Sequence, residues 1–214
     1  MKKQVTVVDY GLGNLFSVGR ALAVVGAEVN VTWRPEAIRS ADRLVLPGVG
    51  AFGDGMERLR ERELLEPLAQ FAKSGRPLLG ICLGMQLLFS ESEEFGRHEG
   101  LGLIAGSVLR LSEVDEDGQR VKVPHVGWSE LERPGLGADW DSTFLDGLAD
   151  AESMYFVHSY VPFPERETLI LARFTYGGRS YCAAIEENNL MGIQCHPEKS
   201  GHVGLRVLSN FLNR

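Results

Sequence analysis

Apolar residues recur in two alternating patterns along the N-terminal part of the chain. Four short runs have the apolar or β-branched character of buried strands: residues 4–9, 28–33, 43–46 and 77–79. Residues 14–25 and 63–73 instead place apolar side chains three and four positions apart, which predicts helices. Another helix is expected to begin near Asp54 or Gly55. Strands that alternate with helices predict a parallel sheet covered on both faces, with functional loops at the carboxyl ends of its strands.

The pattern changes after Phe89, where residues 90–100 are acidic and polar. Five later stretches have strand character: residues 107–111, 120–124, 154–161, 168–175 and 180–185. Turn sequences join the first two at residues 115–118 and the last two at residues 177–178. Residues 201–212 predict a closing helix. The expected fold is a single α/β domain over residues 1–214, with a mixed, largely parallel central sheet flanked by helices and an added antiparallel strand region.

Composition narrows the possible functions. With 44% hydrophobic and 24% charged residues, the 214-residue chain is typical of a globular domain with a substantial core. It contains no apolar stretch of membrane-spanning length and begins without a signal-peptide core, so we expect a cytoplasmic protein that does not contact membranes. Three cysteines without regular spacing suit a reducing compartment. A net charge of −7 disfavours nucleic acid as a partner, and no motif indicates a metal ion or cofactor.

The strongest chemical signal is GICLGMQ, residues 80–86, which lies between two apolar runs. This arrangement predicts a strand, a sharp turn and a helix, with Cys82 at the corner as a nucleophile. Gly80 and Gly84 suit such a corner, because a Cβ there would collide with the adjacent strand or helix. The first turn of the helix would favour a thiolate and could hold an oxyanion. A structural core cysteine is the alternative, and the two glycines disfavour it.

A thiol nucleophile needs a base, and the base needs a group that orients it. His196 is the best-placed candidate, because Pro197 ends the preceding strand and turns the following residues into a loop. Glu198 is close enough in sequence to hold the far nitrogen of the imidazole. The other four histidines have simpler explanations, as solvated groups for His98 and His202 and as structural groups on strands for His125 and His158.

Two glycine-rich loops follow predicted strands. In residues 47–55, PGVGAFGDG, glycines could let backbone amides turn toward a bound group, which makes this loop a candidate second oxyanion donor. A flexible turn before the next helix is an equally good explanation for the loop taken alone. Residues 9–14, DYGLGN, have some likeness to a dinucleotide-binding fingerprint, but Phe16 occupies the place of the third glycine. We therefore do not expect a cofactor site there.

Together, GICLGMQ and the CHPE sequence at residues 195–198 resemble the motifs of the class I, or triad, glutamine amidotransferases, and the match extends over nearly the whole chain. Within this family, four further stretches are similar to the glutaminase subunits of imidazole glycerol phosphate synthase: residues 9–14, 47–52, 124–128 and 158–160. Val126 and Ser129 depart from that pattern, because those subunits more often have Met and Asn there. The resemblance implies a flavodoxin-like α/β fold.

The resemblance also implies roles for particular residues. Cys82 would attack the side-chain amide of glutamine, His196 would take and return the thiol proton, and Glu198 would orient His196. The oxyanion would be held by backbone N–H groups, those of Leu83 and of Val49 or Gly50. The amino-acid end of glutamine would be bound by a set of four residues, Gln86, Glu94, Ser159 and Tyr160. Without the resemblance, a helix-surface residue and a solvated charge would be the simplest explanations of the first two.

A partner is implied in the same way. The family resemblance predicts a heterodimer with a (β/α)8-barrel synthase subunit of the HisF type, which uses the ammonia to make imidazole glycerol phosphate and an aminoimidazole carboxamide ribotide in histidine biosynthesis. A dry passage would keep the ammonia unprotonated. Asn14 and Trp128 are the candidate interface residues, although ordinary core packing is an equally good explanation for the tryptophan from spacing alone. We expect low glutaminase activity in the isolated chain.

Three other functions fit part of the sequence. A triad amidotransferase that supplies a different synthase would share the nucleophile and base but would lack the DYGLGN opening. A cysteine peptidase or γ-glutamyl hydrolase would act without a partner. A regulatory subunit would carry an unreactive Cys82.

Overall fold

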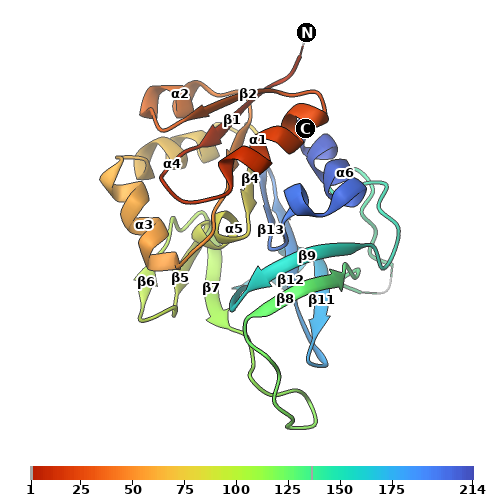
Figure 1. The fold of residues 1–214 in the computed structure, drawn as a ribbon. Coiled ribbons are helices and arrows are strands. Elements are labelled where there is room, and N and C mark those ends of the chain that lie inside the picture. Colours follow the sequence, from red (N-terminus) through yellow and green to blue (C-terminus); the bar gives the residue numbers. More distant parts are fainter. Residues whose placement is uncertain (1, 136) are drawn as a thin grey trace.

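Seven strands form the central sheet of the computed structural model, which describes residues 2–135 and 137–214. They are β1 (Gln4–Val8), β2 (Glu28–Thr32), β3 (Leu44–Leu46), β4 (Leu78–Ile81), β11 (Ile170–Tyr176), β12 (Arg179–Glu187) and β13 (Leu190–Ile193). Their order is β11-β12-β13-β4-β3-β1-β2, and the strands from β13 to β2 run parallel (Figure 1). Because β11 and β12 are antiparallel, the predicted mixed, largely parallel sheet is confirmed.

Helices cover both faces of this sheet, as the strand–helix alternation predicts. One face carries α1 (Leu15–Val24) and α6 (Gly201–Leu212), and the other carries α2 (Pro35–Ser40), α3 (Phe52–Glu61), α4 (Leu65–Lys73) and α5 (Leu83–Leu87). Val7, Val45 and Leu79 belong to the first apolar core together with Leu22 and Phe211 of the helices. Successive strand residues point to opposite faces, so their neighbours supply the second core.

The remaining strands build two smaller sheets. A four-stranded sheet contains β5 (Phe89–Ser92), β6 (His98–Glu99), β7 (Ile104–Arg110) and β10 (Tyr160–Pro164). A two-stranded antiparallel sheet pairs β8 (His125–Glu130) with β9 (Ser153–His158). Two short 3-10 helices, η1 (Glu167–Leu169) and η2 (Pro197–Lys199), follow in the last third of the chain. The four-stranded sheet contains one parallel pair, β5 with β7, and β8 packs beside β11 (Figure 1).

Adjacent parallel strands bring two distant parts of the chain together. β4 and β13 pair in register from Leu78 with Leu190 to Ile81 with Ile193. Parallel neighbours end at the same edge of a sheet, so the residue after β4, Cys82, lies beside the segment that follows β13. This pairing positions the candidate site.

Most predicted elements occur with shifts of one to three residues at their ends, but two strand predictions are wrong. The predicted strand 120–124 contributes only an isolated bridge between Val114 and Arg120, and the regular strand β8 begins at His125. Pro124 has no N–H to donate to a ladder, so pairing starts after it. The predicted strand 154–161 is two strands, because β9 pairs with β8 whereas β10 pairs with β7.

Helix boundaries also differ from the predictions. The helix expected near Asp54 or Gly55 begins at Phe52, and the one expected from residue 63 begins at Leu65 because Glu63 has a φ of 55°. The six-residue α2 was not predicted. It buries only Ile38, so it produces no apolar periodicity, although a proline at its first position is a typical start signal. The polar stretch 90–100 contributes to β5 and to β6.

None of the helices in the described ranges combines the length and the apolar character that a membrane crossing requires.

The buried aromatic side chain of α4, Phe71, should contribute far more to stability than the exposed aromatic side chain of Phe95. Phe71 is 0% exposed within the second core, whereas Phe95 is 84% exposed. We expect Phe71→Ala to lower the free energy of unfolding by about 3–5 kcal/mol and Phe95→Ala to change it by less than about 0.5 kcal/mol. Urea denaturation followed by circular dichroism checks both values. Equal effects of the two substitutions would contradict the described core.

Candidate active site

Cys82 occupies the sharp corner that the sequence predicts. It has a φ of 54° and a ψ of −112°, an uncommon conformation for a residue with a side chain, and its N–H donates to the carbonyl of Ile193 at 2.8 Å. A Cβ at Gly84 would lie 1.8 Å from the Leu46 carbonyl oxygen, and one at Gly80 would lie 2.7 Å from the backbone N of Met85. The two flanking glycines are therefore required by the neighbouring strand and helix, as predicted.

His196 and Glu198 form a buried pair in the segment after β13. The two atoms His196 Nδ1 and Glu198 Oε1 are 2.8 Å apart, and the side chains are 2% and 1% exposed. A carboxylate oxygen accepts, so Nδ1 carries the proton and Nε2 is turned away from the carboxylate. The backbone is fixed as well, because His196 N–H donates to the Tyr155 carbonyl at 2.9 Å and Ser200 Oγ donates to the His196 carbonyl at 2.7 Å.

The free nitrogen of this imidazole interacts with the nucleophile candidate. Burial alone would lower the pKa of His196, but hydrogen bonding and charge interactions with Cys82 and Glu198 overcome it and raise the pKa to about 10. Nε2 is buried, and no group within residues 2–135 and 137–214 forms a hydrogen bond of standard geometry with it. A loose contact between base and nucleophile is common in unliganded active sites and tightens when substrate binds. The raised pKa favours the protonated imidazole, which can stabilise negative charge on the sulfur.

A cavity of about 250 Å³ opens beside Cys82. Its lining contains eight of the sequence-predicted site residues, Cys82, Leu83, Val49, Gly50, Gln86, Glu94, Ser159 and Tyr160, together with Val157 and His158. The structure thus brings together groups from four separate stretches of the chain. His196 and Glu198 are buried next to Cys82 rather than exposed in this cavity.

Two of the lining residues are held by hydrogen bonds, so they are neither free surface groups nor solvated charges. Gln86 is 4% exposed, and its Nε2 donates to the Tyr160 carbonyl at 2.9 Å. Glu94 Oε2 accepts from the N–H of Phe52 at 2.6 Å. Partial burial raises the pKa of Glu94, more than this hydrogen bond lowers it. A bound cation at Glu94 would therefore favour its ionised form.

The loop after β3 uses its glycines for two different reasons. At Gly48 the reason is space, because a Cβ would lie 2.3 Å from the Tyr10 hydroxyl and 2.8 Å from the Leu83 Cβ. At Gly50 the reason is conformation, because its φ is +114° and no atom would obstruct a Cβ there. The loop therefore packs tightly onto the Cys82 corner at one end and has freedom of conformation at the other.

Gln194 is the site residue that the sequence analysis missed. It is 0% exposed, its Nε2 lies 3.6 Å from Cys82 Sγ, and its Oε1 accepts from Gln86 Nε2 at 3.0 Å. A signal was available, because residues two apart in an extended segment point to the same side, so Gln194 accompanies His196 while Cys195 points away. Cys195 and Cys182 are buried core residues, as expected.

The remaining histidines only partly follow the predictions. His125 and His158 are paired across β8 and β9 and are buried, and Ser129 Oγ is hydrogen-bonded to His125 Nε2 at 3.0 Å. His202 is exposed. The prediction that His98 is solvated is wrong: it is half-buried, because its ring packs on the backbone at Gly53.

The two candidate interface residues lie outside the cavity lining. Trp128 is 57% exposed, so core packing is not its role. Val126, on the same side of β8, is 54% exposed. Asn14 is half-buried and accepts a hydrogen bond from Ser17 N–H at 3.4 Å, which caps α1.

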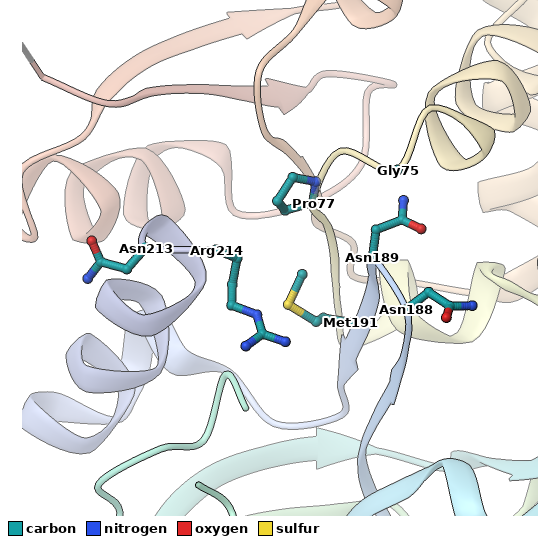
Figure 2. Close-up of a pocket in the computed structure, with 7 residues that line it drawn as sticks. All are labelled: Gly75, Pro77, Asn188, Asn189, Met191, Asn213 and Arg214. Atoms are coloured by element: carbon teal, nitrogen blue, oxygen red, sulfur yellow. The ribbon is translucent and has the colours of Figure 1, made fainter. Parts of the chain in front are cut away.

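A second cavity, of about 530 Å³, lies at the opposite edge of the sheet (Figure 2). Its lining contains Gly75 and Pro77 before β4, Asn188 and Asn189 before β13, Met191 within β13, and Asn213 and Arg214 after α6. The Asn189 amide already donates to the carbonyls of Ala72 and Arg76 at 2.9 and 2.8 Å. This lining holds no nucleophile or imidazole, so the smaller cavity at Cys82 is the candidate active site.

Comparison with known proteins agrees with this geometry. Residues 6–214 match the family described as glutamine amidotransferase class-I, so the chain belongs to the class I glutamine amidotransferases. The solved "Structure of PurLQS from Thermotoga maritima" has the same fold, with a TM-score of 0.75 at 21% identity over 100% of this chain and 99% of that chain. Another, titled "Crystal structure of glutamine amidotransferase", has a TM-score of 0.67 at 20% identity, covering 98% of this chain and 99% of that one.

Curated relatives narrow the assignment. The chain is 51% identical over 208 residues to "Imidazole glycerol phosphate synthase subunit HisH 1" of Legionella pneumophila strain Lens, covering 97% of this chain and 98% of the relative. It is 48% identical over 210 residues to the HisH subunit of Syntrophotalea carbinolica, covering 97% and 98%. Within the class I amidotransferases, the chain therefore belongs to the HisH family.

Burial of His158 should make the protein less stable in mild acid. Burial, and after it the neighbouring His125, lowers the pKa of His158 from 6.5 to about 3. Below about pH 6.5 the unfolded chain therefore binds a proton that the folded chain does not, and stability falls as the pH falls toward 3. Between pH 6.5 and about pH 4.5, wild-type protein should lose about 2 kcal/mol more than His158→Gln.

Urea denaturation at the two pH values measures this difference. His202→Gln, which changes an exposed histidine, serves as the matched control and should follow the wild type. Equal losses in wild type and His158→Gln would show that His158 is not buried in its neutral form.

Proposed function

We propose that this protein hydrolyses glutamine to glutamate and ammonia as the HisH subunit of imidazole glycerol phosphate synthase, with Cys82 as nucleophile. One observation carries the assignment of residues: a cysteine on a strained corner adjoins an imidazole whose far nitrogen is held by Glu198 at 2.8 Å. This is the arrangement that nucleophilic catalysis by a thiol requires. Family membership supplies the reaction class.

The first half of the reaction forms a thioester. Cys82 Sγ, as the thiolate, attacks the carbonyl carbon of the glutamine side-chain amide, and the carbonyl oxygen takes the negative charge. His196 then gives its Nε2 proton to the departing nitrogen, and ammonia leaves as the C–N bond breaks. Glu198 stabilises the imidazolium and keeps Nε2 directed at the sulfur.

The second half regenerates the thiolate. His196, now neutral, accepts a proton from water, whose oxygen attacks the thioester carbonyl. Cleavage of the C–S bond restores the thiolate beside the protonated imidazole and releases the side-chain carboxylic acid, which gives its proton to solvent to become glutamate. Both halves pass through an oxyanion, for which the N–H of Leu83 and one N–H from Val49 or Gly50 are the proposed donors. The φ of +114° at Gly50 gives this part of the loop the freedom to orient such a donor.

The polar lining suits the amino-acid end of glutamine. Both hydrogens of Gln86 Nε2 are engaged, so its Oε1 is the atom left to accept from the substrate ammonium. Glu94 uses Oε2 for Phe52, and Oε1 can face the same ammonium. Ser159 and Tyr160 lie where the chain passes from β9 to β10, and both line the cavity. These four residues are the proposed glutamine-binding set.

The proposed partner is a (β/α)8-barrel synthase subunit of the HisF type, which would receive the ammonia and form a heterodimer with this chain. The relatives are named as subunits, which supports an obligatory partner. Trp128 and Val126 are exposed on one side of β8, and exposed aromatic residues are frequent anchors of protein interfaces. Ammonia that reached water would mostly become ammonium, so a closed junction between the subunits has a chemical reason.

Replacing the nucleophile should separate the two subunits' activities. In the reconstituted complex, we expect Cys82→Ala to reduce glutamine-dependent product formation by about 10⁴-fold or more. Product formation from added ammonium salt should stay within about twofold of wild type, because it needs only the partner. Cys182→Ala, a buried cysteine in the other core, is the matched control and should retain glutamine use.

Assays of the isolated chain distinguish the alternatives. Full glutaminase activity without a partner would contradict the coupling of the two subunits. Hydrolysis of γ-glutamyl peptides in preference to glutamine would indicate a hydrolase instead.

Trp128 provides a test of the interface. Because its side chain is 57% exposed, Trp128→Ala should leave the free energy of unfolding within about 0.5 kcal/mol of wild type. It should weaken binding of the barrel subunit by about 30-fold or more, as expected for an aromatic anchor. Trp33→Ala, at a similarly exposed residue (53%) that follows the sheet-edge strand β2, is the control. Calorimetric titration measures the affinity of each variant for the barrel subunit. Equal affinities of Trp128→Ala and Trp33→Ala would show that Trp128 is not an interface residue.

A further inference from the structure

A chain of buried amides connects the glutamine-binding set to the nucleophile. The Tyr160 carbonyl accepts from Gln86 Nε2 at 2.9 Å, Gln194 Oε1 accepts from the same nitrogen at 3.0 Å, and Gln194 Nε2 lies 3.6 Å from Cys82 Sγ. Both glutamine side chains are buried, and that of Gln194 is fully enclosed. An unpaired buried N–H group is costly, so the contact between Gln194 Nε2 and the sulfur calls for an explanation.

The direction of this chain is determined by one atom. A backbone carbonyl only accepts hydrogen bonds, so the nitrogen of Gln86, and not its oxygen, must face Tyr160. That nitrogen presents its second hydrogen to Gln194, which must therefore turn its own oxygen toward Gln86. The Gln194 nitrogen is then the atom left for Cys82 Sγ. Reversing either amide would bring two acceptors or two donors face to face.

We propose that Gln194 is a positioning residue for the nucleophile: its Nε2–H group donates to Cys82 Sγ and holds the sulfur, as the thiolate, between this amide and the imidazole of His196. A thiolate accepts a hydrogen bond more strongly than a thiol does, so a fixed donor favours the reactive form. An amide transfers no proton at neutral pH, so Gln194 assists His196 without replacing it. This inference rests on the proposed function for the identity of the reaction, but the contact between Gln194 Nε2 and Cys82 Sγ does not depend on it.

The same chain connects substrate binding to the sulfur. Gln86 Oε1 is the proposed acceptor for the substrate ammonium, and its Nε2 is the donor to Gln194. A cation on the oxygen of an amide polarises its N–H bonds, and hydrogen bonds in a chain strengthen one another. Occupation of the ammonium position therefore strengthens the donor that Gln194 presents to Cys82. The side chain of Gln86 thus links the binding of the substrate ammonium to the hydrogen bond at Cys82.

Alkylation of Cys82 tests this role directly. The rate of modification by iodoacetamide, measured at a series of pH values with peptide mass spectrometry to separate Cys82 from the buried Cys182 and Cys195, reports the fraction of thiolate. In Gln194→Met, which keeps the volume but has no N–H, the pH midpoint should rise by about one unit. In Gln194→Glu, which puts an oxygen against the sulfur, it should rise further. Gln70→Met, at an exposed glutamine, should leave it unchanged.

Steady-state kinetics with the partner gives the second readout. In Gln194→Met, kcat should fall about tenfold at neutral pH, and the difference from wild type should become smaller as the pH rises. KM for glutamine should change less than about threefold. Unchanged alkylation midpoints in both folded Gln194 variants would overturn the proposal. A fall in kcat without a change of midpoint would do the same, because a merely structural residue would give that result.

Wild-type protein provides a test that does not depend on the folding of Gln194 variants. The side-chain amide resonances of Gln194 should shift with pH at the midpoint found by alkylation and should not do so in Cys82→Ser. Resonances that are independent of pH in the wild type would overturn the proposal. Neither the alkylation measurement nor the resonance measurement requires glutamine. Failure of the wild-type complex to hydrolyse glutamine would therefore refute the proposed function without affecting the test of the contact between Gln194 and Cys82.

Discussion

The pairing of β4 with β13 is the constraint on which the candidate site depends. The two strands are distant in sequence but parallel and in register, so Cys82 and the segment 194–198 leave the sheet at the same edge. The hydrogen bond from Cys82 N–H to Ile193 carries this pairing one residue beyond β4. Gly84 has no room for a Cβ against Leu46, so the start of the helix after Cys82 packs directly on the backbone of β3.

Burial determines how charge is arranged around that corner. A protonated His196 is stable there only because Glu198 and Cys82 are close enough to outweigh its loss of water. His158, nearby and without such partners, remains neutral in the same surroundings. Two histidines in one region thus have pKa values shifted in opposite directions, because only His196 has a carboxylate and a thiol as partners. The amides of Gln86 and Gln194 add a donor to the sulfur without adding charge.

The sequence contains enough to predict the layers of the fold and the corner at Cys82, because apolar periodicity and flanking glycines are local signals. It fails where pairing partners decide the structure: residues 154–161 form one apolar run, yet Ser159 separates strands of two different sheets. Gln194 cannot be identified from sequence alone, because a polar residue near a strand end has many explanations until its neighbours are known. The exposure of Trp128 was undecidable from spacing, since an aromatic residue fits a core or an interface.

The central claim is that Cys82 is the nucleophile and that His196 activates it. An electrophilic analogue of glutamine tests this most directly, with the site of attachment read by peptide mass spectrometry in the presence of the barrel subunit. The claim predicts a single adduct, on Cys82, whose formation slows at least about a hundredfold in His196→Asn and is prevented by excess glutamine. Inactivation with the adduct on another residue, or an adduct on Cys82 that forms at the wild-type rate without the imidazole, would contradict it.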